Sequence, residues 1–264
     1  MTHFTWNVDP ILLDLGPLQL RWYGLLFTGG FLIGYYLMLW MYKREHRDVR
    51  QLDRLLIYMF AGAVIGARLG HILFYQPEYY LAHPLEILMI WKGGLASHGG
   101  TVGMLIACYL FLRHTSDPYL YFVDRLTIPI AWGSMCIRLG NFFNSEILGP
   151  VTDSWSGIIF ARVGPEPRHP AQLYEAVAYL LTFLLLLFLY KRKAGIWANG
   201  FLTGSMFVCI FGARFVIEFS KDEQADYVLN LPLNVGQLLS IPFIALGIYF
   251  LVYSYKHTQG TSKP

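Results

Sequence analysis

Three arginine side chains, Arg68, Arg138 and Arg214, interrupt long apolar stretches of this 264-residue chain. If those stretches cross a membrane, each charge costs roughly 2.5–3.5 kcal/mol near the bilayer centre, so each requires a partner, a wet cavity or a function. The planar guanidinium fork matches the oxygen atoms of phosphate, and the three arginines together therefore favour an anionic ligand. The alternative for Arg68 and Arg138 is a guanidinium that caps backbone carbonyl groups between helices.

The sequence neighbours of two of these arginines differ. Glu218 follows Arg214 by one helical turn, which predicts an ion pair that orients the Arg214 guanidinium. Arg138 has no acidic residue one turn away, whereas Asn141 lies three positions after it and Glu146 follows the expected helix end. Arg138 is therefore the arginine that we most expect to face a ligand.

A glycine-dense run at residues 93–100 contains Ser97, His98 and Gly99. Glycine lets the backbone approach a ligand closely, and a helix start offers unpaired N–H groups to an anion. The alternative for Gly99 is a close contact between membrane helices. His98 adds a group that accepts a proton near neutral pH, as a general base must; the alternative is a structural histidine.

Several chemistries lack their required residues. The sequence has no HExxH or similar pair of metal ligands at helical spacing, no P-loop and no dinucleotide-binding glycine motif, so we expect neither a metal nor a cofactor. Cys108, Cys136 and Cys209 lie in apolar runs without metal or redox spacing and are expected to be buried thiols. Metal-free chemistry on an anionic, membrane-resident substrate remains.

The composition indicates that a membrane surrounds these groups. The chain is 55% hydrophobic and 14% charged, against about 45–50% and about 25% in soluble globular proteins. The formal net charge of +3 is too small to favour nucleic acid as a partner. The sequence therefore predicts a membrane protein that binds membrane lipid and no nucleic acid.

Seven apolar segments are long enough to cross a bilayer core of about 30 Å, which needs about 20 helical residues. They predict an all-α, polytopic membrane protein with seven transmembrane helices, in a single membrane-embedded domain over residues 1–264. The segments are residues 22–42, 55–75, 94–112, 124–143, 171–190, 199–219 and 236–255.

The basic residues predict the orientation of these segments. Eleven Lys and Arg residues fall in the loops after the first, third and fifth segments and in the C-terminal tail, and Arg125 at the start of the fourth segment makes twelve, against five on the other side. Because Lys and Arg are enriched in cytoplasmic loops, the N-terminus is expected outside and the C-terminus in the cytoplasm. The costly polar groups then converge on the outer half of the membrane, below a turn-rich external segment at residues 144–170.

Six blocks of sequence resemble the phosphatidylglycerol:prolipoprotein diacylglyceryl transferase family of bacteria, in the same order and over nearly the whole chain. The most specific is the polar run Arg138-Leu139-Gly140-Asn141-Phe142-Phe143-Asn144-Ser145-Glu146. The others are Arg21-Trp22-Tyr23-Gly24, Gly66-Ala67-Arg68 with Phe74-Tyr75, the run from Gly94 to Gly100, Arg168-His169-Pro170-Ala171-Gln172-Leu173-Tyr174-Glu175, and Gly212-Ala213-Arg214 through Glu218-Phe219.

The resemblance implies a transferase of the bacterial cytoplasmic (inner) membrane. Such an enzyme moves the diacylglyceryl group of phosphatidylglycerol to the lipobox cysteine thiol in the signal peptide of a preprolipoprotein, the first step of lipoprotein maturation. The products are a thioether-linked lipid and glycerol phosphate. The family's head-group arginine corresponds to Arg138, and its second arginine and the glutamate that follows correspond to Arg214 and Glu218. Further family positions correspond to Tyr23, His98, Asn141, Glu146 and Gly149.

The chain also departs from the family pattern. Ser145 stands where many members have glycine, Pro150 and Lys221 stand where arginine is common, and the segment around residues 150–167 is short. These differences concern the contacts of the outer loop.

The residues and the resemblance suggest one mechanism. Arg138 and Arg214 would hold the phosphate and stabilise charge on the departing oxygen, while Arg68 and Gly99 would help to bind the substrate. His98 would take the thiol proton, although an electropositive pocket alone also raises the thiolate fraction. The competing hypotheses are an anion transporter, whose path also needs polar groups in the inner half of the membrane, and a structural membrane partner.

Overall fold

The computed structural model describes residues 3–16, 19–90, 94, 96–115, 118–193, 197–221 and 233–261. The chain forms two compact units. The first contains Met1–Met38 and Leu120–Pro264, and the second contains Leu39–Tyr119.

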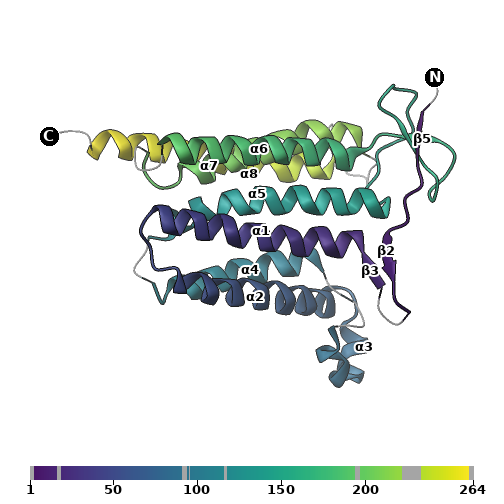
Figure 1. Ribbon diagram of the computed structural model, residues 1–264, viewed down its shortest axis with the longest axis horizontal. Coiled ribbons are helices and arrows are strands. Elements are labelled where there is room, and N and C mark those ends of the chain that lie inside the picture. Colours follow the sequence, from purple (N-terminus) through teal and green to yellow (C-terminus); the bar gives the residue numbers. More distant parts are fainter. Residues whose placement is uncertain are drawn as a thin grey trace. The chain divides into compact units, whose positions relative to one another are not determined.

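Long apolar helices make up most of the first unit, and they run side by side (Figure 1). Met135 and Cys136 on one helix pack against Ala176 and Tyr179 on another, while side chains such as Leu181 stay exposed, as expected for a face in contact with lipid. The helices are α1 (Trp22–Arg44), α5 (Tyr119–Asn144), α6 (Ala171–Lys193), α7 (Phe201–Ile217), which continues into the 3-10 turn η3 (Glu218–Ser220), and α8 (Val235–Thr261).

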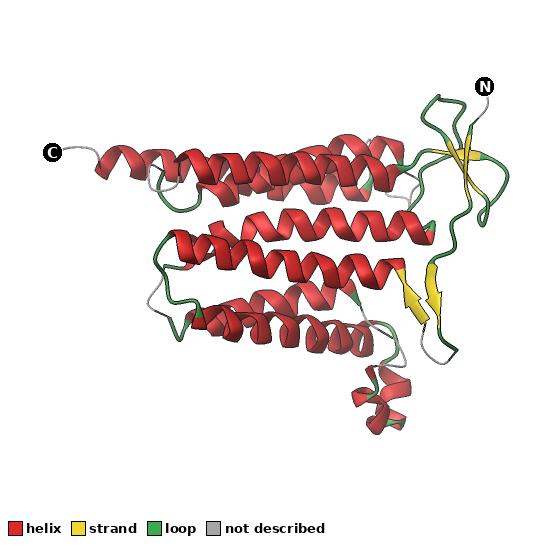
Figure 2. Ribbon diagram, in the orientation of Figure 1, coloured by secondary structure: helices red, strands yellow, loops and turns green. Residues whose placement is uncertain are grey.

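Short strands lie beside one end of these helices (Figure 2). Strand β1 (Phe4–Trp6) pairs in parallel with β4 (Ile158–Phe160), which pairs antiparallel with β5 (Pro167–Arg168). Strands β2 (Ile11–Asp14) and β3 (Gln19–Arg21) form an antiparallel pair. The fold is thus mostly helical, and these short strands are the exception to the all-α prediction. Strands of two to four residues are too short to show the alternation that marks a strand in sequence.

The second unit is built on a close pair of helices, α2 (Arg50–Phe74) and α4 (Ser97–Leu112), with α3 (Pro77–Ala82) and the 3-10 helix η1 (Pro84–Leu88) between them in sequence. Glycines at four-residue spacing on both helices bring the two backbones together. A Cβ atom added at Gly66 would lie 2.7 Å from the Cα of Gly103, and one at Gly70 would lie 2.7 Å from the Cα of Gly99. Such small residues are typical of contacts between membrane helices.

A helix occupies each of the seven segments predicted to cross the membrane. Within the described part of the chain, five helices are long and apolar enough to do so: α1, α2, α6, α7 with η3, and α8. Helix α4 has only 16 residues, and α5, which contains Asp124, Arg125 and Arg138, does not meet that standard. The structure thus supports a mostly helical membrane protein, whereas seven crossings and the orientation stay predictions.

Candidate active site

Arg138 lies near the end of α5 and is held from two directions. Its Nε lies 2.8 Å from Oε2 of Glu175, a fully buried residue in the second turn of α6. Its Nη1 donates to Oδ1 of Asn141 over 3.3 Å, one helical turn later on α5. The acidic partner that the local sequence does not supply therefore comes from another helix.

Glu175 and Glu218 are joined through Lys221. The Lys221 ammonium donates to Oε1 of Glu175 over 2.9 Å and lies 3.2 Å from Oε2 of Glu218. The predicted ion pair between Arg214 and Glu218 is not formed. Helix α7 ends at Ile217, so Glu218 belongs to the 3-10 turn η3 and not to the same helix as Arg214. The Glu218 carboxylate faces Lys221 and packs on Gly236 at the start of α8.

The Arg214 guanidinium consequently has no hydrogen bond or ion pair with any residue that the structure describes. Its charge acts on the Tyr179 hydroxyl, which also lies within range of the Arg138 charge. Tyr179 is buried on α6, one turn after Glu175. The first unit thus brings two arginines around one buried tyrosine, and only one of them is matched by a carboxylate.

The residues after Arg138 fix the turn that follows α5. Asn141 donates through Nδ2 to Oε2 of Glu146 over 3.0 Å, and the Glu146 carbonyl accepts from the Gln172 amide of α6. Tyr23 of α1 packs over Gly140, where an added Cβ atom would lie 2.7 Å from the ring. Its hydroxyl lies within range of the charges of Arg138 and Glu146.

Gly149 occupies a tightly packed position in the same unit. Its backbone N–H donates to the carbonyl of His169 over 2.9 Å. An added Cβ atom would lie 2.7 Å from the Cβ of His169 and would collide with the Ser220 carbonyl. Any larger residue at Gly149 would therefore displace the chain around η3, next to Lys221.

Arg68, in the second unit, is a buried cap for backbone carbonyl groups. Its Nε donates to Ile87 over 2.9 Å and its Nη1 to Gly94 over 3.1 Å, while Nη2 donates to the carbonyl of Glu86. These bonds tie η1 and Gly94 to α2. The structure thus shows the capping alternative for Arg68.

His98 is the second residue of α4, and its side chain is exposed. Exposure leaves the imidazole accessible to a substrate. Gly99, the next residue, faces α2, where an added Cβ atom would lie 2.8 Å from the Cα of Gly70. The helix-contact alternative for Gly99 is therefore what the structure shows.

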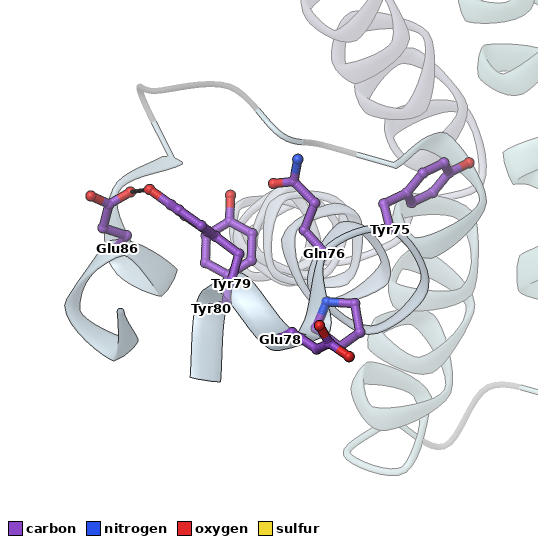
Figure 3. A pocket seen from close by; sticks show the side chains of 7 residues that line it. Tyr75, Gln76, Glu78, Tyr79, Tyr80 and Glu86 are labelled. Carbon is purple, nitrogen blue, oxygen red and sulfur yellow. Dashed lines mark hydrogen bonds between the residues drawn. The ribbon is translucent and has the colours of Figure 1, made fainter. Parts of the chain in front are cut away.

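A hollow of about 770 Å³ opens in the second unit between the end of α2 and α3 with η1 (Figure 3). Tyr79 donates to Oε2 of Glu86 across it over 3.0 Å. None of the predicted site residues lines it, and its charged side chains are carboxylates, which repel an anion. The lining residues are Tyr75, Gln76, Pro77, Glu78, Tyr79, Tyr80 and Glu86.

The family model for prolipoprotein diacylglyceryl transferases matches residues 10–253. The chain belongs to this family. Relatives named phosphatidylglycerol–prolipoprotein diacylglyceryl transferase include a protein of Tolumonas auensis, 52% identical over 252 residues, which are 95% of this chain and 97% of the relative. Another, from Chloroherpeton thalassium, is 47% identical over 260 residues, 98% of this chain and 97% of the relative. A third, from Bacteroides fragilis, is 43% identical over 261 residues, 94% of each chain.

Family membership confirms the resemblance seen in the sequence blocks, and together with the apolar helices it makes the chain a multi-pass membrane protein of bacteria. In this transferase-family chain, the first unit contains Tyr23, Arg138, Asn141, Glu146, Gly149, Arg214 and Glu218. The second contains Arg68, His98 and Gly99.

Sequence reasoning missed two residues that the geometry makes central, Glu175 and Lys221. The sequence could have indicated Glu175 as a site residue, because it is ionisable, lies early in an apolar segment and ends one of the family-like blocks. Lys221 stood out only as a departure from the family pattern. Neither signal shows that the two side chains meet, since that contact joins α6 to the end of η3.

Proposed function

We infer that this chain is a phosphatidylglycerol–prolipoprotein diacylglyceryl transferase, which performs the first step of bacterial lipoprotein maturation. One observation carries the inference: a family match over residues 10–253 includes the polar run from Arg138 to Glu146, which the structure holds in a network of charged side chains. The acceptor is the lipobox cysteine thiol in the signal peptide of a preprolipoprotein.

The reaction is a substitution at carbon. The thiol sulfur forms a bond to the glyceryl carbon of phosphatidylglycerol, and the bond from that carbon to the phosphate oxygen breaks. The electron pair of the broken bond leaves with glycerol phosphate, while the thiol proton passes to a base. The site must therefore hold a phosphate whose charge grows on the departing oxygen.

Arg138 and Arg214 bind that phosphate. Arg214 supports this role because no described carboxylate offsets its charge. Tyr23, Asn141 and Glu146 orient Arg138 or bind the head group, and their contacts with one another support this assignment.

The remaining predicted residues serve the same reaction. His98 takes the thiol proton, and its exposure leaves it open to the acceptor. Arg68 and Gly99 help to bind the substrate, while Gly149 and Glu218 support the chain around η3.

The two units together form one domain over residues 1–264 in the cytoplasmic membrane. The family match runs through the two units without a break, which supports a single domain. Seven crossings place the N-terminus outside and the C-terminus in the cytoplasm, in accord with the excess of Lys and Arg on the inner side. The active site then faces the outer side.

The test incubates purified protein with phosphatidylglycerol and a lipobox peptide that contains one cysteine. We expect glycerol phosphate release together with a gain in peptide mass of one diacylglyceryl group. A peptide with serine in place of that cysteine is the control and should give neither. A folded protein that binds the lipid but releases no glycerol phosphate would contradict the assignment and favour anion transport.

A further inference from the structure

A row of four charged side chains runs through the first unit beside Tyr179. Arg138 lies 2.8 Å from Glu175, Glu175 lies 2.9 Å from Lys221, and Lys221 lies 3.2 Å from Glu218. The four come from α5, α6 and the region of η3. Two of the four side chains are buried: that of Glu175 is 0% exposed and that of Lys221 is 4% exposed.

Glu175 is the centre of this row. Each carboxylate oxygen contacts a different cation, Oε2 facing Arg138 and Oε1 facing Lys221, and the Tyr179 hydroxyl lies 3.5 Å from Oε1. A buried carboxylate is stable only when nearby cations offset its charge, and here Oε1 accepts a hydrogen bond from Lys221 while Oε2 has the ion pair with Arg138. Since both oxygens are engaged, the carboxylate cannot rotate without breaking a contact.

This geometry sets the direction of the Arg138 guanidinium. Glu175 engages Nε and Asn141 engages Nη1, and the Tyr179 hydroxyl lies within hydrogen-bonding range of the same guanidinium. The Arg138 side chain is 16% exposed, whereas Glu175 is not exposed at all. An acceptor from outside the protein therefore reaches Arg138 but not Glu175.

The charges along the row also matter. Glu175 alone would neutralise Arg138 and reduce its attraction for an anion. Lys221 shares the Glu175 carboxylate, so that only part of its negative charge is directed at Arg138. Lys221 in turn is balanced by Glu218.

We propose that Glu175 is a positioning residue for diacylglyceryl transfer and that Lys221 acts through it. Glu175 holds Arg138 with the exposed part of its guanidinium turned to the substrate phosphate, and Lys221 keeps the carboxylate in place while drawing its charge away from Arg138. The proposal rests on the proposed function, because it assigns Arg138 to the phosphate of the lipid substrate.

The first test replaces Glu175 with Gln and, separately, with Asp. Glutamine keeps the length but places an amide N–H group against one of the two cations, whereas aspartate keeps the charge and is one methylene too short to reach both. Because a displacement of about 1 Å can lower a rate by about 100-fold, we expect both variants to lower kcat by about 10- to 100-fold. KM for phosphatidylglycerol should change by less than about threefold, since Arg138 and Arg214 both remain.

The matched control is Glu166→Gln, which removes an exposed carboxylate from the same unit. It should leave kcat and KM unchanged. Thermal unfolding in detergent accompanies every variant. If Glu175→Gln accumulates poorly, Glu175→Asp keeps the test open because it retains the buried charge.

A double-substitution comparison separates positioning from a merely structural role. Lys221→Met should lower kcat by about tenfold, and Glu175→Gln combined with Lys221→Met should be no slower than the slower single variant, because both act through Arg138. Losses that multiply, an unchanged kcat in Glu175→Asp, or activity that falls only in proportion to folded protein would overturn the proposal. If the wild-type protein itself releases no glycerol phosphate, the proposed function fails instead.

Discussion

Arg214 carries a charge that no described carboxylate offsets, although it is only partly exposed near the end of an apolar helix. Keeping a cation there without a partner costs free energy, because burial weakens its hydration. An incoming phosphate removes that cost when it binds. Arg214 is thus the residue at which ligand binding and protein stability are expected to oppose one another.

Arg214→Gln should therefore separate activity from stability. We expect kcat to fall by roughly 100- to 1000-fold, the range seen when one group that stabilises a developing oxyanion is removed. The melting temperature of the ligand-free protein should stay the same or rise, because an uncompensated charge has been removed. Initial rates of glycerol phosphate release and thermal unfolding measure the two effects. A lower melting temperature would show that Arg214 has a structural partner.

His98→Gln tests the proton acceptor in the second unit. A general base contributes about 100- to 10,000-fold to a rate, so kcat should fall within that range while the affinity for phosphatidylglycerol is unchanged. Since the His98 side chain is exposed, the substitution should not lower the melting temperature. Equal losses of turnover and lipid binding would instead assign His98 to binding.

At the scale of elements, the end of α5 is held in a strained turn. Ser145 has a φ of 56° and Ile147 a φ of 58°. The left-handed conformation costs an L-residue roughly 1–2 kcal/mol, which glycine does not incur. The strain places Glu146 opposite Asn141, so the turn is part of the arrangement around Arg138.

Ser145→Gly should relieve this strain. Glycine loses more conformational freedom on folding, by about 0.5–1 kcal/mol, so we expect a net gain in stability of about 0.5–1 kcal/mol. Thermal unfolding should show a higher midpoint with transfer activity retained. Ser154→Gly is a suitable comparison, because Ser154 does not have a positive φ and should gain nothing. An unchanged or lower midpoint for Ser145→Gly would show that the surrounding chain offsets the strain.

The packing of α2 against α4 allows a second test at this scale. Gly103→Leu would place a branched side chain where even a Cβ atom would lie 2.8 Å from the Cα of Gly66. The helices would have to separate, so we expect the variant to fail to accumulate in the membrane. Val102→Leu, at an exposed position on α4, should accumulate normally. Normal accumulation of Gly103→Leu, measured by quantitative immunoblotting, would contradict this account.

How far the sequence predicts these elements depends on the range of the interactions that define them. The helices follow from runs of apolar residues, so their positions could be predicted. Strands β1 and β4 could not, because each is three residues long and pairs with a segment far away in the chain. Contacts between residues distant in the chain are equally hard to predict in the site. The sequence shows that Asn141 and Glu218 lie one helical turn from Arg138 and Arg214. The contacts of Glu175 with Arg138 and Lys221, in contrast, depend on how α5, α6 and η3 pack.

At the scale of the whole molecule, the path through the membrane depends on α4 and α5. Five helices meet the requirements for crossing, and these two do not. A helix of 16 residues is about 24 Å long at 1.5 Å per residue, short of a bilayer core of about 30 Å. The glycine-dense run before α4 and the basic residues Arg113 and Arg125 nonetheless fit an inward crossing followed by an outward one.

The loop between α4 and α5 distinguishes the two topologies. With seven crossings, residue 114 lies in the cytoplasm; if α4 and α5 do not cross, it lies outside. The termini are on opposite sides in both cases, so fusions at the ends would not separate them. We propose His114→Cys in a variant whose three natural cysteines, Cys108, Cys136 and Cys209, are replaced by alanine.

The introduced thiol is treated with a maleimide that does not cross membranes. We expect no labelling in intact spheroplasts and full labelling after the membrane is permeabilised, since Arg113 favours the cytoplasmic side. Ser154→Cys, in the segment predicted to be external, is the positive control and should be labelled in intact spheroplasts. Labelling at residue 114 in intact spheroplasts would show that α4 and α5 do not cross. His98, at the outer end of α4 in the seven-crossing topology, would then lose its assigned depth in the membrane, and its role as the base would require a different path for the acceptor thiol.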